Sequence, residues 1–235
     1  MSGVRIRPGG PRPIRRGHPS RTRWRPPRRR GHVLRRCWRL YLPELGSFPE
    51  RLRSALASRS PARSERPEGR RAAVAILVTN EAKPAILFIR RRERAGDPWS
   101  GQMALPGGFV SPGDESLAAA ARRETTEETG VVLQGEDELI GELDDVSPRT
   151  PYLPPLVVTP FVFLVGGRPA ARPGPEVEAT VWLAVDDLYD PHRRRPYRLR
   201  LAGAERTFES IVIGEYVIWG LTERILQQLA VLAGV

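Results

Sequence analysis

Three glutamates, Glu124, Glu127 and Glu128, are spaced three and four residues apart in a segment of helical character. Residues with this spacing share one face of a helix, with about 5–6 Å between their Cβ atoms. Three carboxylates this close repel one another, and the negative end of the helix dipole adds to the repulsion. A hard divalent cation would neutralise them, and oxygen ligands without nearby His or Cys favour Mg²⁺ or Mn²⁺ over zinc. The alternative is a helix face that is fully solvated.

The residues around this acidic cluster favour the metal interpretation. Arg123 precedes the glutamates, Gly130 follows them, and Pro106-Gly107-Gly108 lies upstream at the expected end of a strand. Glycines at such a position let backbone groups approach a phosphate or a metal closely, because no Cβ stands in the way. We therefore expect Gly107 and Gly108 to contact the bound substrate or metal through their backbone.

The segment resembles the Nudix box, in which a glycine, five residues, a glutamate and seven residues precede R-E-U-x-E-E-x-G-U, where U is aliphatic. The matching residues are Glu115, Arg123, Glu124, Glu127, Glu128, Gly130 and Val131. Two positions depart from the pattern: Thr125 replaces an aliphatic residue, and Phe109 occupies the position of the box glycine. Because of the second departure, the Gly107-Gly108 loop is one residue longer than in the general pattern.

This longer loop is similar to that of the coenzyme A diphosphatase branch of the family. The further matches to the branch are Arg92, Gly101, Gln102, Asp114, Ser116, Ala121, Val158–Pro160, Glu176-Val177 and Trp219–Thr222. The resemblance covers about residues 72–230 and departs at Gly96, Asp97 and Trp99. It implies metal-dependent hydrolysis of coenzyme A to 3′,5′-ADP and 4′-phosphopantetheine. The alternative substrate is another nucleoside diphosphate derivative, such as ADP-ribose or a nucleotide sugar, or an oxidised nucleoside triphosphate.

Metal ions held by the helix would neutralise the diphosphate, orient the attacking water and lower its pKa. The expected metal ligands are Glu124, Glu127 and Glu128, of which Glu124 and Glu128, one turn apart, form the best pair. We expect Arg123 to lie on the opposite side of the helix from much of this cluster and to form a salt bridge with Glu115 or Asp114. A contact between Arg123 and the substrate is the alternative.

The general base is either one of the box glutamates or Glu176, which precedes a strand in a segment rich in Pro and Gly. A solvated loop position is the other interpretation of Glu176. Arg92 either binds a substrate phosphate or is a solvated charge. Trp99 and the loop Val146–Pro155 are candidates for the wall of the substrate site, because irregular loops beside a catalytic helix often determine specificity.

The elements that must position these residues follow from hydrophobic periodicity and cap residues. The catalytic helix should run from the N-cap Ser116 to Thr129, with Gly130 ending it. The other expected elements are a helix over 45–56, strands at Ala72–Thr79, Pro84–Arg90, Leu139–Leu143, Val157–Val165, Val177–Val185 and Thr207–Ile213, and a helix over Glu215–Leu232. The pattern predicts an α/β protein, a Nudix-like α/β/α sandwich with a mixed sheet, a catalytic loop-helix and a C-terminal helix. We expect Trp182 and Trp219 in its core.

The net charge of +11 is located in the N-terminal tail. Residues 1–43 carry 14 arginines and no acidic side chain, so the rest of the chain holds 24 basic and 27 acidic groups, a net charge of −3. Proline and like-charge repulsion predict a disordered tail over 1–43, before a short helix and polar linker over 44–71 and a Nudix hydrolase domain over 72–235. The tail is an extension without function, a nucleic-acid-binding arm or a targeting segment.

The composition also excludes several classes of protein. A single cysteine, Cys37, excludes an internal disulfide framework and a Cys-rich zinc site, and no apolar run reaches the length of about 18 residues that a membrane span needs. We therefore expect a cytoplasmic protein with a small-molecule nucleotide substrate and no membrane partner. Nucleic acid would bind only through the tail, and a homodimer is one alternative assembly. A non-catalytic nucleotide- or RNA-binding module is the rival function, although such a module has no need for the repulsive acidic cluster.

Overall fold

The computed structural model describes residues 46–64, 70–94, 100–134, 139–148, 155–201 and 204–235 of the chain. All of them belong to one compact unit, Pro43–Val235. The predicted tail over 1–43 and the candidate Trp99 lie outside the described residues. In the described part, no helix is long and apolar enough to cross a membrane.

A seven-stranded sheet forms the centre of the described structure. Its strands are β1 (Arg70–Thr79), β2 (Ala85–Arg91), β3 (Met103–Ala104), β4 (Gly107–Phe109), β5 (Leu139–Glu142), β6 (Leu156–Val165) and β7 (Val177–Ala184). The order is β3-β2-β1-β6-β5, with β4 also paired to β1 and β7 to β2. Strands β1 and β6 are parallel, whereas the other pairs are antiparallel. The predicted mixed sheet is therefore confirmed.

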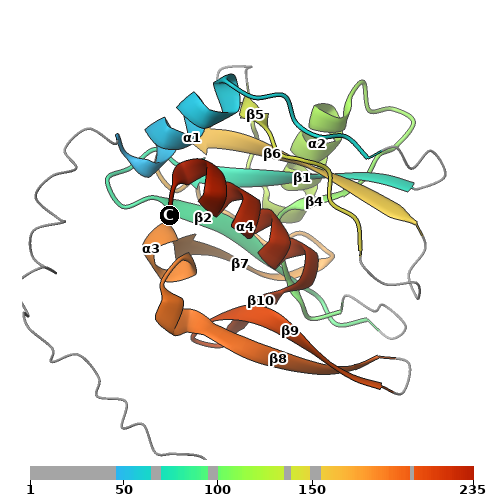
Figure 1. The fold of residues 1–235 in the computed structure, drawn as a ribbon. Coiled ribbons are helices and arrows are strands. Elements are labelled where there is room, and N and C mark those ends of the chain that lie inside the picture. The colour runs from blue at the N-terminus through green and yellow to red at the C-terminus, as the bar shows by residue number, and fades with distance from the viewer. Residues whose placement is uncertain (1–45, 65–69, 95–99, 135–138, 149–154, 202–203) are drawn as a thin grey trace, which may run out of the picture. The chain divides into compact units, whose positions relative to one another are not determined.

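Helices cover both faces of this sheet. Figure 1 shows α1 (Phe48–Ala57) and α4 (Gly220–Ala233) in front of the sheet and α2 (Leu117–Thr129) behind it. Side chains of β1 alternate between the two layers: Ile76 and Val78 pack in the core that α1 and α4 share, and Ala75 and Leu77 pack against α2. This period of two is what an extended strand imposes. It confirms the predicted α/β/α sandwich.

The ends of α2 follow from two local signals. The Ser116 side chain accepts a hydrogen bond from the Ala119 amide at 3.1 Å, which satisfies one of the free N–H groups of the first turn. Gly130 adopts a left-handed conformation with φ of 69° and ends the helix. Both ends agree with the prediction from sequence.

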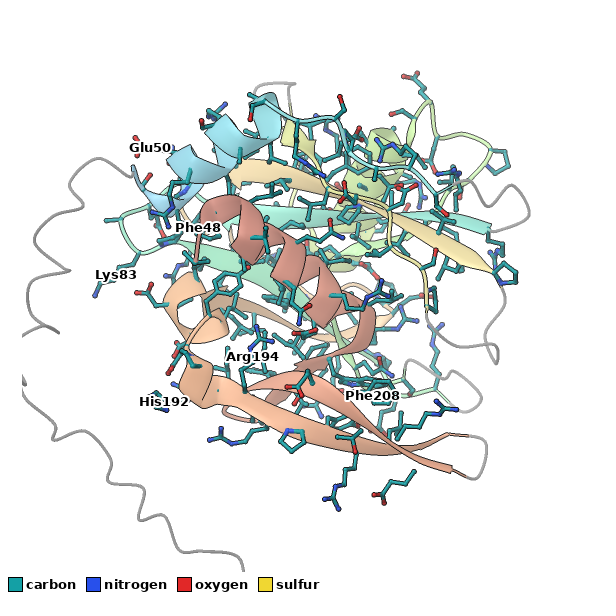
Figure 2. The ribbon with its side chains drawn as sticks, in the orientation of Figure 1. Phe48, Glu50, Lys83, His192, Arg194 and Phe208 are labelled. Carbon is teal, nitrogen blue, oxygen red and sulfur yellow. The ribbon has the colours of Figure 1, made fainter. Side chains whose placement is uncertain are left out.

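A second, three-stranded antiparallel sheet lies beside α4. It consists of β8 (Arg194–Leu201), β9 (Ala204–Ile213) and β10 (Tyr216–Trp219), and it follows α3 (Val185–Leu188) and the 3₁₀ turn η2 (Pro191–Arg193). Arg194 extends from β8 toward α4 (Figure 2), where it forms an ion pair with the buried carboxylate of Glu223. This pair connects the small sheet to the helix that packs on the main sheet.

The predicted helix over Glu215–Leu232 is wrong at its start. Tyr216–Trp219 form strand β10, and α4 begins only at Gly220. Ile213 and Tyr216 pair across the two-residue turn Gly214-Glu215, in which Gly214 has a φ of +59°. A glycine in such a turn favours a tight hairpin, and the pairing with β9 then satisfies the backbone of this short β-branched and aromatic segment. Local apolar spacing alone did not reveal this pairing.

The segment after α1 is fastened to the main sheet through Asp145, whose side chain is 1% exposed. Its carboxylate accepts hydrogen bonds from the Thr159 hydroxyl at 2.6 Å and the Ser64 amide at 2.9 Å. The guanidinium groups of Arg63 and Arg71 lie 3.3 Å and 3.6 Å away. Asp145 is therefore a buried charge that is fully partnered.

We predict that Asp145→Ala lowers the free energy of unfolding by about 3 kcal/mol, because it leaves buried donors without an acceptor. Urea denaturation measures this change. The control Glu209→Ala, at an exposed position on β9, should change the free energy of unfolding by less than about 0.5 kcal/mol. A loss of similar size in both variants would contradict the role given to Asp145.

Candidate active site

The three glutamates of α2 lie in different environments. Glu128 is buried, with 7% of its surface exposed, and the Glu124 side chain is 17% exposed. The Glu127 side chain is 58% exposed. Glu124 and Glu128 are one turn apart and face β4, since α2 packs on this strand. The predicted cluster therefore divides into an inner pair, Glu124 and Glu128, and an outer carboxylate, Glu127.

The inner pair lies against the backbone of the glycine loop. The Gly107 amide donates a hydrogen bond of 2.9 Å to Glu128 Oε2. A Cβ on Gly108 would lie only 2.5 Å from Glu124 Cδ, so the absence of a side chain permits this approach. The loop is itself held in register, because Val74 pairs with Gly107 across β1 and β4. The structure thus brings Gly107, Gly108, Glu124 and Glu128 together.

Arg123 is the cation that organises this end of α2. Its Nε and Nη2 donate to the two carboxylate oxygens of Asp114 at 2.9 Å and 3.1 Å, and its Nη1 donates to Glu124 at 2.8 Å and Glu127 at 3.1 Å. Nη2 also donates to the Phe109 carbonyl at 3.1 Å. The expected salt bridge to Asp114 is confirmed, but the expected position away from the cluster is wrong. The long side chain reaches both sides, and it holds Glu124 in place.

The ion pair between Arg123 and Asp114 shifts the pKa values of both groups. The hydrogen bonds from Arg123 hold the pKa of Asp114 below its ordinary value. In the other direction, the hydrogen bond with Asp114 and the contact with Glu124 raise the pKa of Arg123. Both groups therefore stay charged at all physiological pH values, and the loop from β4 to α2 keeps a fixed ionic anchor.

The pKa of Glu128 is raised, whereas that of Asp114 is lowered. Burial raises its pKa to about 7; the Gly107 hydrogen bond works against this shift, the negative charges of Glu124 and Glu176 add to it, and the positive charge of Arg91 lowers the pKa. A buried carboxyl group surrounded by more negative than positive charge is stabilised by a proton or by a cation. The arrangement therefore favours cation binding next to Glu128.

The inner pair fits a hard divalent cation in its chemistry. No group of three His, Cys, Asp or Glu side chains among the described residues is arranged to hold a metal ion by itself. Mg²⁺ rarely needs such a cage, because it is usually bound by one or two carboxylates together with waters and substrate phosphates. Glu124 and Glu128 supply two carboxylates beside the backbone of the glycine loop.

Of the predicted residues outside α2 and the glycine loop, Glu176 influences Glu128, whereas Arg92 contacts the backbone of β7. Glu176, which immediately precedes β7, forms an ion pair with Arg94 at 3.0 Å and influences Glu128 through its charge. Arg92 donates from Nη2 to the Val177 carbonyl at 3.3 Å, so its guanidinium supports the backbone beside Glu176. Arg91 is the arginine of this segment that influences Glu128. Sequence reasoning missed Arg91, although the alternation of side chains along a strand separates it from its neighbours.

Thr125, the polar departure from the aliphatic pattern, is accommodated inside the helix. It is fully buried, and its hydroxyl donates to the Ala121 carbonyl at 2.7 Å. The hydroxyl is thus satisfied by its own helix. The departure therefore leaves no unpaired polar group beneath the inner pair.

A family model and a curated relative assign the chain to one family. A family model described as NUDIX domain matches residues 69–201. An uncharacterised Nudix hydrolase, NudL, from Citrobacter koseri is 31% identical over 167 residues, which cover 71% of this chain and 84% of NudL. An uncharacterised protein from Schizosaccharomyces pombe is 38% identical over 112 residues, and the match spans 46% of this chain and only 34% of that protein. A MutT/nudix family protein from Enterococcus faecalis has a similar fold, with a TM-score of 0.51 and 21% identity over 78% of this chain and 68% of that one.

The two loop glycines should respond differently to a side chain. A Cβ at Gly107 would lie 2.3 Å from the Ala73 carbonyl oxygen, and its φ of +153° is unfavourable for other residues. We predict that Gly107→Ala lowers the free energy of unfolding by at least about 2 kcal/mol. Gly108→Ala should cost less than Gly107→Ala, because the atoms it meets are the end of a side chain and not the backbone. Gly113→Ala, with nothing within 4 Å, is the control in urea denaturation. Equal losses for Gly107 and Gly108 would contradict this distinction.

The raised pKa of Glu128 predicts a pH-dependent stability in metal-free buffer. Its pKa is about 7 in the folded protein against 4.5 for an ordinary glutamate side chain, so the folded state holds a proton that the unfolded chain lacks between these values. Stability from this group is therefore complete below about pH 4.5, falls as pH rises toward 7, and is lost above it, by about 3 kcal/mol. Glu128→Gln should remove this loss and be more stable than the parent protein at pH 8.

Urea denaturation at pH 5 and pH 8 in the presence of a chelator measures this difference. The exposed Glu127→Gln is the matched control and should follow the parent protein at both pH values. The prediction fails if the stability of Glu128→Gln relative to the parent protein is no greater at pH 8 than at pH 5. In that case the ionised Glu128 carboxylate does not lower the stability of the metal-free protein.

Proposed function

Because this chain belongs to the Nudix hydrolase family, whose members act on pyrophosphate bonds, we propose that it hydrolyses the diphosphate linkage of coenzyme A or its derivatives with Mg²⁺ or Mn²⁺. The products would be 3′,5′-ADP and 4′-phosphopantetheine. One observation carries the chemistry: two carboxylates of α2, Glu124 and Glu128, meet the backbone of the Gly107-Gly108 loop. The choice of coenzyme A is supported by the longer glycine loop, Gly101-Gln102 and Trp219–Thr222.

Glu124 and Glu128 would hold the metal ion, and the more exposed Glu127 would be a third ligand. When bound, the ion would neutralise the diphosphate and lower the pKa of the attacking water. Arg123 fixes the Glu124 carboxylate through a hydrogen bond of 2.8 Å. We propose that the substrate phosphates bind beside the backbone of Gly107 and Gly108. The chain would thus contribute a rigid, negatively charged binding site for the cation.

Two groups are candidates for the general base. Glu128 has a pKa of about 7, which suits proton transfer near neutral pH. Glu176 lies on a separate segment, where its carboxylate is 59% exposed and is paired with Arg94. An exposed carboxylate on an ion pair can turn toward a bound substrate at low cost, since such pairs are weak. We propose Glu176 as the base when the cation occupies Glu128.

A different nucleoside diphosphate derivative is the second candidate substrate. The observation that favours it is the departure from the coenzyme A pattern at Gly96, Asp97 and Trp99, which lie outside the described residues. A binding protein without activity is a weaker proposal, because the buried Glu128 destabilises the metal-free protein and a silent module would gain from losing it. The reaction and the substrate are therefore separate questions.

Incubation of the purified protein with coenzyme A, ADP-ribose and a dinucleoside polyphosphate, each with Mg²⁺, Mn²⁺ or chelator, tests the proposal. We expect metal-dependent conversion of coenzyme A to 3′,5′-ADP, identified by chromatography. Glu128→Gln should lower kcat by at least about 100-fold while keeping the fold. Glu209→Gln, at an exposed position away from α2, is the control. Cleavage of ADP-ribose with coenzyme A left intact would refute the branch, and full activity of Glu128→Gln would refute the metal assignment.

A further inference from the structure

A cavity of about 390 Å³ lies between the end of β2, the loop before β3 and the small sheet. Its walls include Arg90, Gln102, Tyr197, Tyr216 and Trp219. The expected core position of Trp219 is therefore wrong, since this side chain is only partly buried and borders the cavity. A cavity of this volume is within the range of small-molecule sites, which begins at about 300 Å³.

One wall of the cavity is aromatic. The ring of Trp219 packs against Tyr197 and Phe208, with centroids 4.9 Å and 5.2 Å apart. Strand pairing fixes these rings on one side of the small sheet, because Tyr197 is paired with Phe208, and Trp219 is paired with Ser210. Figure 2 shows Phe208 on this sheet, below α4. The wall is thus held in place before any ligand binds.

The rim of the cavity carries charge and neutral polar groups. Arg90 donates to Glu215 at 3.2 Å and lies 3.5 Å from Glu178. Ser100 and Gln102 line the same space from the loop before β3. A flat aromatic wall with a few hydrogen-bonding groups around it suits a heteroaromatic ring better than an aliphatic chain, because the ring can stack and the polar groups can bind its edge.

The cavity is close to the catalytic loop along two stretches of chain. Met103 borders the cavity and precedes Gly107 by four residues, so their Cα atoms are at most about 14 Å apart. Arg90 borders the cavity, and its neighbour Arg91 influences Glu128. The strand register shifts between these two residues, as in a β-bulge, which redirects side chains next to many active sites. The cavity lies on the face of the main sheet that α1 and α4 cover, and α2 packs on the other face. A substrate that occupies both sites would pass the β3–β4 segment, which pairs with β2 through β3 and with β1 through β4.

One wall of the cavity lies beyond the part of the chain that matches the family model. Tyr216, Val217 and Trp219 belong to β10, which lies beyond residues 69–201 that match the family model. The inner pair and the glycine loop lie within that range. The catalytic parts therefore lie within the matched domain, whereas this wall lies beyond it, in the segment whose Trp219–Thr222 resemble the coenzyme A diphosphatase branch.

We propose that this cavity binds the base of the nucleotide half of the substrate, stacked on the aromatic wall that Trp219 and Tyr197 form. The inference rests on the proposed function, because it assumes a nucleotide diphosphate whose phosphates lie at Glu124 and Glu128. Stacking of a base on an aromatic side chain strengthens binding by about 5- to 150-fold. The base would thereby fix which end of the diphosphate faces the water that Glu128 or Glu176 activates.

Ligand-observed NMR titration of the full chain with AMP and with ribose 5-phosphate tests the proposal, since the two probes differ only in the base. We expect AMP to bind at least about 5-fold more tightly to the parent protein. Trp219→Leu should abolish this preference, and Trp219→Phe should keep part of it. Trp182→Phe, on the opposite face of the main sheet, is the matched control and should keep the full preference.

Circular dichroism establishes whether Trp219→Leu is folded. If it is not, Val217→Phe, which reduces the volume of the cavity without removing an aromatic residue, should abolish the preference instead. Equal binding of AMP and ribose 5-phosphate to the parent protein overturns the proposal. A preference that survives in folded Trp219→Leu and in Val217→Phe overturns it as well. The proposal is also overturned if Trp219→Leu loses binding of 4′-phosphopantetheine while its binding of AMP is unchanged, because the cavity would then hold the other half of the substrate.

The same titration separates this inference from the proposed function. A protein that hydrolyses coenzyme A but binds both probes equally keeps its function and loses the base site. A protein that hydrolyses none of the diphosphates tested, but has an AMP preference that depends on Trp219, keeps the base site and loses the proposed activity.

Discussion

The contact between the Glu128 carboxylate and the Gly107 amide constrains the rest of the site. It joins the catalytic helix to a three-residue strand, and that strand pairs with β1 at the centre of the main sheet. Any movement of α2 relative to β4 would break a hydrogen bond inside a region with little water, where an unpaired carboxylate is expensive. The carboxylates of α2 are thus held by the most rigid part of the fold, which is what a site that must position a cation and a water requires.

This arrangement has an electrostatic cost, which the fold reduces locally but does not remove. Arg123 neutralises part of the charge at Glu124 and Glu127, and Asp114 keeps the guanidinium in place from the other side. Glu128 has no such contact with Arg123, and burial, together with the charges of Glu124 and Glu176, raises its pKa to about 7. The uneven distribution has a functional consequence. The carboxyl group that is least compensated within the protein is the one most able to gain from a bound cation.

The sequence predicted α2, its caps and the acidic cluster well, because these depend on contacts three and four residues apart. It also predicted the mixed sheet, since β1 and β6 are long apolar runs. It failed where structure depends on distant pairing. Tyr216–Trp219 have helical spacing but form β10, because β9 offers a partner across a two-residue turn. For the same reason Trp219 was expected in the core. The influence of Arg91 on Glu128 could not be distinguished from that of Arg90 or Arg92 without knowing the strand register.

That register connects the two parts of the proposed substrate site. Arg90 and Arg91 are neighbours on β2, yet one contacts Glu215 beside the cavity and the other influences Glu128 beside the glycine loop. Adjacent residues of a strand point to opposite sides, and the register shift between these two redirects them further. A single strand end can therefore support both the chemistry and the recognition of the substrate. A change in the hairpin β9–β10 can then alter which nucleotide is bound without disturbing the carboxylates of α2, because the two regions share β2 but have no catalytic side chain in common.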